Sequence, residues 1–125
     1  MAYNNTVTVV GNVVRDPELA YTQSQTAVVR MSVAHNRPPR SDGHKFEPSF
    51  FDVSVFGKQA ENVAESVRKG ARVVVFGSIR QQRWTSQDGQ PRTKVEILAD
   101  EVAPSLRFAT ADISRNPYTS EASDA

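Results

Sequence analysis

Residues 50–84 read FFDVSVFGKQAENVAESVRKGARVVVFGSIRQQRW, and this stretch decides the fold class. Its first seven residues alternate between an apolar set and a mixed set, which predicts a strand. The next apolar residues follow at helical spacing and predict one amphipathic helix that ends by Gly70: Ala60, Val63, Ala64 and Val67. A β-branched run over residues 71–84 then predicts a second, longer strand.

Strand patterns continue on both sides of this unit. Upstream, residues 6–14 and 26–34 predict two strands, and Gly11 marks a bulge or bend in the first. Downstream, a turn containing Asp88-Gly89 leads into a strand over residues 92–99. Three strands, one helix and two strands is the order of an all-β OB-fold, a five-stranded Greek-key barrel with its helix between strands 3 and 4. Other small β-barrels and α+β domains share this order, so the pattern alone leaves them open.

Length and composition fit one compact domain with a tail. The chain has 125 residues, of which 38% are hydrophobic and 23% charged. We expect residues 1–111 to form the folded and oligomer-forming domain, with a further short strand at 105–111. We expect residues 112–125 to form a flexible tail. Residues 35–45 carry Pro, Gly and charge but few apolar side chains, which predicts a long exposed loop.

Several classes of protein are excluded by what the sequence lacks. There is no cysteine, and His35 and His44 lie nine residues apart, so we expect neither a metal site nor a cofactor. No apolar run approaches the roughly 20 residues of a membrane helix, and the first residues lack the plan of a signal peptide. We therefore predict a cytoplasmic protein. The isolated acids have turn or surface roles, and no catalytic motif is present, so we predict no enzymatic activity: Asp16, Asp52 and Asp100.

Charge is distributed unevenly along the chain. Residues 1–109 hold 14 of the 15 Lys and Arg and 11 of the 14 Asp and Glu, so the folded part is mildly basic. Such a balance is common among soluble domains and only weakly favours a nucleic-acid partner. The placement of the cations is more informative.

Three groups of residues have the chemistry to bind single-stranded nucleic acid, in which bases stack on rings and cations neutralise phosphates. The predicted hairpin carries four cations beside the only tryptophan: Arg80, Arg83, Trp84, Arg92 and Lys94. An inward-packing tryptophan is the alternative. Phe50 and Phe56 lie opposite the apolar side of their strand. They could form a stacking platform; the alternatives are that they lie in a subunit interface or that the strand is buried on both sides. The third group is the loop cations Arg37, Arg40 and Lys45, which would contact phosphates if the loop folds over the DNA. The alternative is that they lie in a solvated loop without a binding role.

Several motifs resemble the bacterial single-stranded DNA-binding protein family over residues 4–109. They occur in order: Val10-Gly11-Asn12 with Arg15-Asp16-Pro17-Glu18, Phe56-Gly57-Lys58-Gln59-Ala60-Glu61-Asn62, Val67-Arg68-Lys69-Gly70-Ala71-Arg72-Val73, and Arg83-Trp84-Thr85 with Asp88-Gly89. Residues 100–111 further resemble the actinobacterial branch, in which an added C-terminal strand clamps subunits in the tetramer.

The resemblance implies residue roles. It assigns base stacking to Trp84, Phe50 and Phe56. It assigns contacts with the DNA backbone to five cations: Lys58, Arg68, Lys69, Arg80 and Arg83. The loop aromatic common in the family aligns near Pro38-Pro39 and is lost, and Phe at position 50 offers less ring area than the usual Trp. We therefore expect weaker binding per subunit.

The end of the sequence departs from the family as well. Residues 119–125 lack the long linker and the acidic tip with an apolar Pro-Phe pair that recruits replication and repair enzymes. The resemblance implies a homotetramer that coats single-stranded DNA in replication, recombination or repair. If the sequence is full length, it resembles an accessory paralogue with little recruitment of enzymes, whereas a trimmed chain would end in the same way. A primosome-type OB-fold assembly protein, with mainly protein partners, is the alternative.

Overall fold

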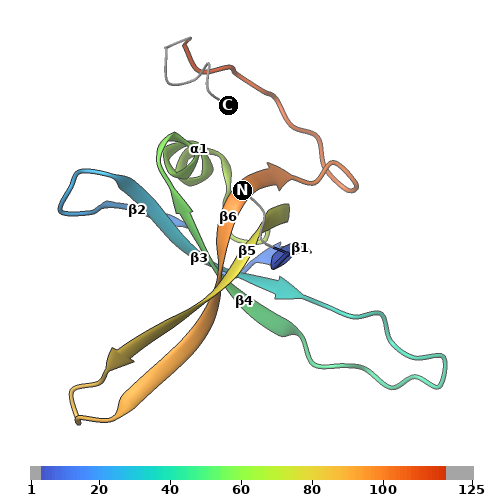
Figure 1. Ribbon diagram of the computed structural model, residues 1–125. Helices are drawn as coiled ribbons and strands as arrows, with labels where there is room; N and C mark the ends of the chain where they lie inside the picture. The colour runs from blue at the N-terminus through green and yellow to red at the C-terminus, as the bar shows by residue number, and fades with distance from the viewer. Residues whose placement is uncertain (1–3, 118–125) are drawn as a thin grey trace.

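The computed structural model describes residues 4–117 (Figure 1). Six strands and one helix occur in that part of the chain: β1 (Thr6–Val13), β2 (Glu18–Tyr21), β3 (Ala27–His35), β4 (Ser49–Phe56), α1 (Lys58–Ser66), β5 (Arg72–Thr85) and β6 (Pro91–Pro104). The strands pair in the order β1-β5-β6-β4-β3-β2. A further pairing of β1 with β3, through Asn12 opposite Ala34 and Val13 opposite Val33, closes the sheet into a barrel. The predicted OB-fold is confirmed.

One short strand was absent from the sequence prediction. β2 pairs antiparallel with β3, with Leu19 opposite Val29, and it lies at the edge of the sheet outside the closed ring. All four of its residues are exposed, so it carries no alternation that marks a half-buried strand. Counted with β2, the helix lies between β4 and β5 rather than between strands 3 and 4. The expected strand over residues 105–111 is also not formed, because β6 continues to Pro104 and the following residues are irregular.

The core is built mainly from valine. Alternate residues of β3, β4 and β5 point into the barrel and are fully buried: Val29, Val33, Val53, Val55, Val73 and Val75. Branching at Cβ restricts these side chains to few rotamers and favours the extended backbone, so the same residue type forms the strands and fills the interior. The buried Ala60 and Val63 of α1 belong to this core.

The helix ends earlier than the sequence predicted. It stops at Ser66, and Val67 is already extended although its N–H still bonds to the Val63 carbonyl at 2.9 Å. The Arg68 guanidinium donates to the carbonyls of Ala64 at 2.6 Å and Val67 at 3.0 Å. A cation at the carboxyl end of a helix satisfies carbonyls that lack intrahelical partners. The cap is therefore a side chain, and Gly70 belongs to the turn after the helix.

Two glycines permit close contacts between strands. A Cβ at Gly11 would collide with the carbonyl of Ala34, so Gly11 lets β1 approach β3 where the barrel closes. Gly77 has the same relation to the carbonyl of Leu98. The irregularity of the sheet lies between Phe76 and Gly77, where the β5–β6 register shifts. Gly11 is thus the close approach that the sequence predicted as a bulge or bend. The register shift lies instead between β5 and β6, where Asp100 of β6 is the residue without a register partner.

Two hairpins project from the barrel and position the site. Figure 1 shows the β5–β6 hairpin and the β3–β4 hairpin diverging from the barrel, with α1 toward the opposite end of the molecule. We call the part of β5–β6 beyond the barrel, residues 80–96, the arm. No helix in residues 4–117 is long and apolar enough to cross a membrane.

Candidate nucleic-acid interface

The arm presents its tryptophan on the same side as the cations Arg92 and Lys94. Trp84 lies opposite Arg92 in the β5–β6 register, and Gln82 lies opposite Lys94. Residues two apart on a strand share a face, so Trp84, Arg92 and Lys94 point the same way. The Trp84 side chain is 46% exposed. The alternative of an inward-packing tryptophan is therefore wrong.

This side of the arm continues over the outside of the barrel. The pairing of β4 with β3 and β6 places alternate residues of four strands on one curved surface, facing away from the valine core. We call it the outer face, and its members are Arg30, Ser32, Phe50, Asp52, Ser54, Phe56, Arg80, Gln82, Trp84, Arg92, Lys94 and Glu96. All three predicted stacking aromatics lie on this face.

The two phenylalanines lie at opposite ends of β4. Phe50 is 62% exposed near the start of the strand, whereas Phe56 is half-buried at its end. Six residues of extended strand place them roughly 20 Å apart. They are two separate stacking positions, and Phe50 offers far more open ring.

Arg83 lies on the other side of the arm. Its register partner is Thr93, and its guanidinium donates to Gln81 Oε1 at 3.0 Å. The sequence prediction grouped Arg83 with Trp84 because the two residues are neighbours in the chain. Adjacent strand residues point to opposite faces, so Arg83 reaches a different part of any bound strand.

Arg80 is engaged within the protein. Its Nε lies 2.7 Å from Glu96 Oε1, and Glu96 is only 2% exposed. The same carboxylate accepts from Gln82 Nε2 at 2.9 Å and from Ser54 Oγ at 3.0 Å. A buried carboxylate requires such donors. The network links β4, β5 and β6 at the base of the arm.

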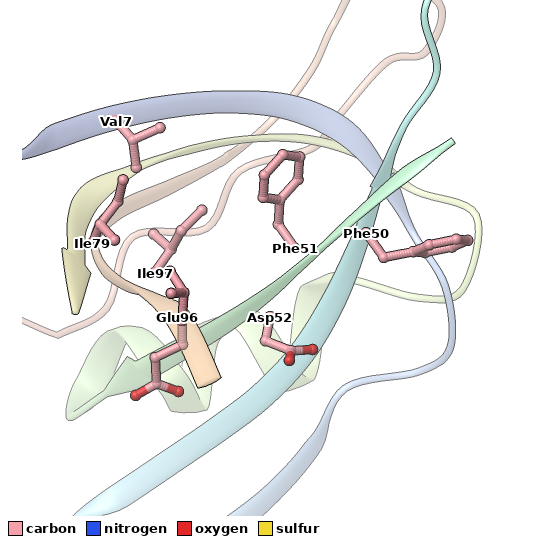
Figure 2. A pocket seen from close by; sticks show the side chains of 8 residues that line it. Val7, Phe50, Phe51, Asp52, Ile79, Glu96 and Ile97 are labelled. Carbon is pink, nitrogen blue, oxygen red and sulfur yellow. The ribbon is translucent and has the colours of Figure 1, made fainter. Parts of the chain in front are cut away.

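Two hollows lie on either side of β4 and β6. The apolar hollow, of about 280 Å³, is lined by Val7, Phe51, Ile79, Val95 and Ile97, with Phe50, Asp52 and Glu96 at its rim. Figure 2 shows the Phe50 ring directed away from the other side chains, and the Asp52 and Glu96 carboxylates directed away from Phe51. The polar hollow, of about 200 Å³, lies on the outer face and includes Arg15, Arg30 and Lys94.

Besides Arg80, four predicted cations have an acidic neighbour. The pairs are Lys58 with Glu61 at 3.1 Å, Arg40 with Asp42 at 2.7 Å, Arg92 with Asp88 at 3.5 Å and Lys94 with Asp52 at 3.6 Å. The hydrogen bond from Lys58 lowers the pKa of Glu61, and that from Arg40 lowers the pKa of Asp42. These pairs are exposed, so each contributes little to stability. A phosphate can displace the carboxylate at a modest cost.

The predicted cations do not form one cluster. Lys58, Arg68 and Lys69 belong to α1 and the turn after it, whereas Arg92 and Lys94 belong to the arm, on the other side of the barrel in Figure 1. Within residues 4–117, neither Lys69 nor Lys45 forms an ion pair. A strand that meets all of these residues must wrap around the barrel.

A comparison with known proteins adds to this geometry. The profile of the single-strand binding protein family matches residues 4–105. The chain belongs to this family. A Corynebacterium glutamicum protein named single-stranded DNA-binding protein is 44% identical over 124 residues, which cover 94% of this chain and 54% of that protein. Proteins with this name from Mycobacterium leprae and Mycolicibacterium smegmatis are 42% and 41% identical, and 92% of this chain covers 71% and 72% of them. The chain thus spans about half the length of the Corynebacterium protein.

These relatives confirm the predicted resemblance to actinobacterial members of the single-strand binding protein family. The expected acidic-tip departure concerns residues 119–125, which lie outside the described part of the chain. Among residues 4–117, no group of three or more His, Asp or Glu side chains is placed to hold a metal ion.

Phe46, in the loop between β3 and β4, is an aromatic that the sequence patterns did not single out. The Arg37 guanidinium lies over the Phe46 ring, 3.8 Å from its centroid, and the His44 ring meets Phe46 edge-on with centroids 5.2 Å apart. Phe46 is half-buried in a loop that is otherwise exposed. Its sequence signal was a lone aromatic among polar residues. The other histidine, His35, holds the base of this hairpin, with Nδ1 3.0 Å from the Val10 carbonyl oxygen.

Arg15 and Arg30 were not predicted as site residues either. Arg30 was one polar residue inside a strand pattern, and Arg15 followed the first strand, so neither belonged to an aromatic and cationic segment. The available signal was the alternation of β3, which places Arg30 away from the buried Val29 and Met31.

Proposed function

We propose that this chain binds and coats single-stranded DNA, with little sequence preference and without catalysing a reaction. The observation that carries the proposal is the exposed Trp84 ring, on the same face as Arg92 and Lys94. A ring beside cations suits a strand whose bases stack while its phosphates are neutralised. The names of the relatives support the same function and do not favour the primosome-type alternative.

The proposed contacts differ in strength. Trp84 and Phe50 supply the exposed rings, and stacking contributes about 1–3 kcal/mol per base. Phe56 is half-buried, so we assign it a smaller share. We propose phosphate contacts for the cations of the arm, the loop and the helix turn: Arg83, Arg92, Lys94, Arg37, Arg40, Lys45, Lys58, Arg68 and Lys69. Arg80 is held by Glu96, and we assign it to the framework of the arm.

We propose that the chain acts as a homotetramer. The outside of β1 and β5 carries an exposed aromatic, because Phe76 is 41% exposed beside Thr8, and half-buried Val10 and Val74 extend the same surface. A contiguous apolar surface of this kind favours contact with another chain. Leu106 and Phe108 are exposed too, and we propose that residues 105–111 become a clamping strand only against a partner copy. Native mass spectrometry with and without dT oligonucleotides reports the number of subunits.

We further propose that residues 1–111 are the binding and assembly domain and residues 112–125 a tail. In the described part of that tail, Asn116 accepts a hydrogen bond from Asn62 of α1 at 2.8 Å. The proposed role is in replication, recombination or repair, in the cytoplasm at the nucleoid.

Fluorescence of the single tryptophan tests the function directly. Titration with a dT oligonucleotide should quench Trp84 emission, and the quenching should reverse when salt is added. Trp84→Ala should weaken binding, measured by anisotropy of a labelled oligonucleotide, and Trp84→Phe should retain part of the affinity. A wild-type protein that prefers duplex DNA, or an unchanged affinity of Trp84→Ala, would contradict the proposal.

A further inference from the structure

We infer that Arg15, Arg30 and Lys94 form a phosphodiester-binding subsite in the polar hollow of the outer face. This inference rests on the proposed function and adds to it a position between the stacking rings. Arg15 and Arg30 belong to none of the segments proposed above to contact DNA.

The fold brings the three cations together from distant parts of the sequence. Arg15 follows β1, Arg30 lies in β3 and Lys94 lies in β6, and all three line the same hollow. Arg30 lies opposite Ser54 of β4, and Ser54 bonds to Glu96, two residues from Lys94. The subsite therefore exists only in the folded barrel.

The charge balance of the hollow is positive. Within residues 4–117, Arg15 and Arg30 form no ion pair, whereas Lys94 has Asp52 at 3.6 Å. Glu96 also lines the hollow, but Arg80 compensates its charge at 2.7 Å. With Asp52 paired to Lys94 and Glu96 paired to Arg80, Arg15 and Arg30 leave the hollow with an excess of positive charge, which attracts an anion.

The position of the hollow identifies this anion as a DNA phosphate. Trp84 lies opposite Arg92, and Lys94 follows two residues later along the same face, roughly 7 Å closer to the barrel. On the other side, Phe50 precedes Asp52 by two residues on β4. Lys94 and Asp52 both line the hollow, so a strand that stacks on Trp84 and Phe50 can place a phosphate in it.

The test is the salt dependence of binding to a labelled dT oligonucleotide. Each phosphate neutralised on a single strand contributes about 0.7 to the slope of log K against log salt concentration. Arg30→Gln and Arg15→Gln should each make the slope shallower by about this amount, and the double variant by about twice as much. Arg115→Gln is the matched control, because it removes one positive charge outside the region that matches the family.

The outcomes separate the subsite from the function. Slopes of Arg30→Gln and Arg15→Gln equal to that of Arg115→Gln would overturn the subsite, while a weakened Trp84→Ala would leave the proposed function standing. Failure of the wild-type protein to bind dT would overturn both. Arg30→Lys keeps the charge and should keep the wild-type slope. If Arg30→Gln lowers the melting temperature, its salt slope also reflects unfolding. The slope of Arg15→Gln then tests the subsite, because Arg15 lies in a turn outside the barrel strands.

Discussion

The Nε of Arg80 donates to the Oε1 of Glu96 at 2.7 Å, at the point where the arm leaves the barrel. Glu96 is a buried charge, and Gln82 and Ser54 complete its hydrogen bonds. A residue that the family motif associates with DNA therefore holds the arm to the barrel in this chain.

Replacing Arg80 should cost stability more than it costs binding. Arg80→Gln leaves a buried carboxylate short of a donor, so we expect the free energy of unfolding to fall by about 1–3 kcal/mol. The salt slope of DNA binding should stay close to the wild-type slope. Urea denaturation and a salt titration measure the two effects. An unchanged stability combined with a shallower slope would show that Arg80 contacts phosphate instead.

Removing the charge of Asp52 should tighten DNA binding. Asp52 lies 3.6 Å from Lys94 on the outer face, so Asp52→Asn releases that cation and removes a repulsion toward phosphate. We expect a higher affinity for a dT oligonucleotide and a salt slope steeper by up to about 0.7. Asp112→Asn, in the tail, is the control for net charge. Equal affinities of the two variants would count against the outer face as the binding surface.

A larger ring at position 50 should strengthen stacking. Phe50 is highly exposed and its ring points away from the apolar hollow (Figure 2), so Phe50→Trp fits without repacking. We expect Phe50→Trp to bind more tightly and Phe50→Ala to lose about 1 kcal/mol or more of binding free energy. Anisotropy titrations measure both. Ile113→Ala, another exposed apolar residue, should bind like the wild type.

A side chain at Gly77 should disturb the barrel. Its Cβ would collide with the carbonyl of Leu98 and lie 2.9 Å from the Ala99 Cα, so β6 must shift. We expect Gly77→Ala to lower the free energy of unfolding by about 1–3 kcal/mol, as overpacking does. Chemical denaturation measures the change. A stability equal to the wild type would mean that the β5–β6 contact is looser than the structure shows.

The turn of the arm should loosen in acid. The Ser86 hydroxyl bonds to Asp88 and, with the Gln90 N–H and Arg92, lowers the pKa of that carboxyl. A lowered pKa in the folded state means that the contribution to stability is complete above the ordinary carboxyl pKa. It is lost as the pH falls through the lowered value.

We therefore expect Asp88→Ala to reduce the protection of the Gln90 amide from hydrogen exchange at pH 7, and the difference from the wild type to shrink as the pH falls. A difference that stays constant with pH would show that the carboxylate charge does not hold the turn.

Sequence patterns predicted the barrel because its strands and helix bury one side. The alternation of Phe51, Val53 and Val55 identifies β4, and the spacing of Ala60 and Val63 identifies α1. β2 has no buried side, so its existence depends on pairing with β3, which no local pattern records. The end of α1 escaped prediction because Arg68, rather than Gly70, caps it.

The candidate site was predictable in composition but not in arrangement. Trp84 and its neighbouring cations form a recognisable segment, whereas the separation of Arg83 from Trp84 depends on strand parity. The burial of Glu96, and with it the role of Arg80, depends on β4 crossing the base of the arm. Arg30 joins Lys94 only because β3, β4 and β6 are neighbours in the sheet.

The pairing of Trp84 with Arg92 limits how the arm can change in length during evolution or by engineering. Deleting one residue of β5 between Gly77, which follows the register shift, and the tip would turn Trp84 to the side now held by Arg83. Removing two residues from each strand would shorten the arm and keep the ring on its present side. Insertions and deletions in this hairpin should therefore be tolerated in even steps and rejected in odd ones.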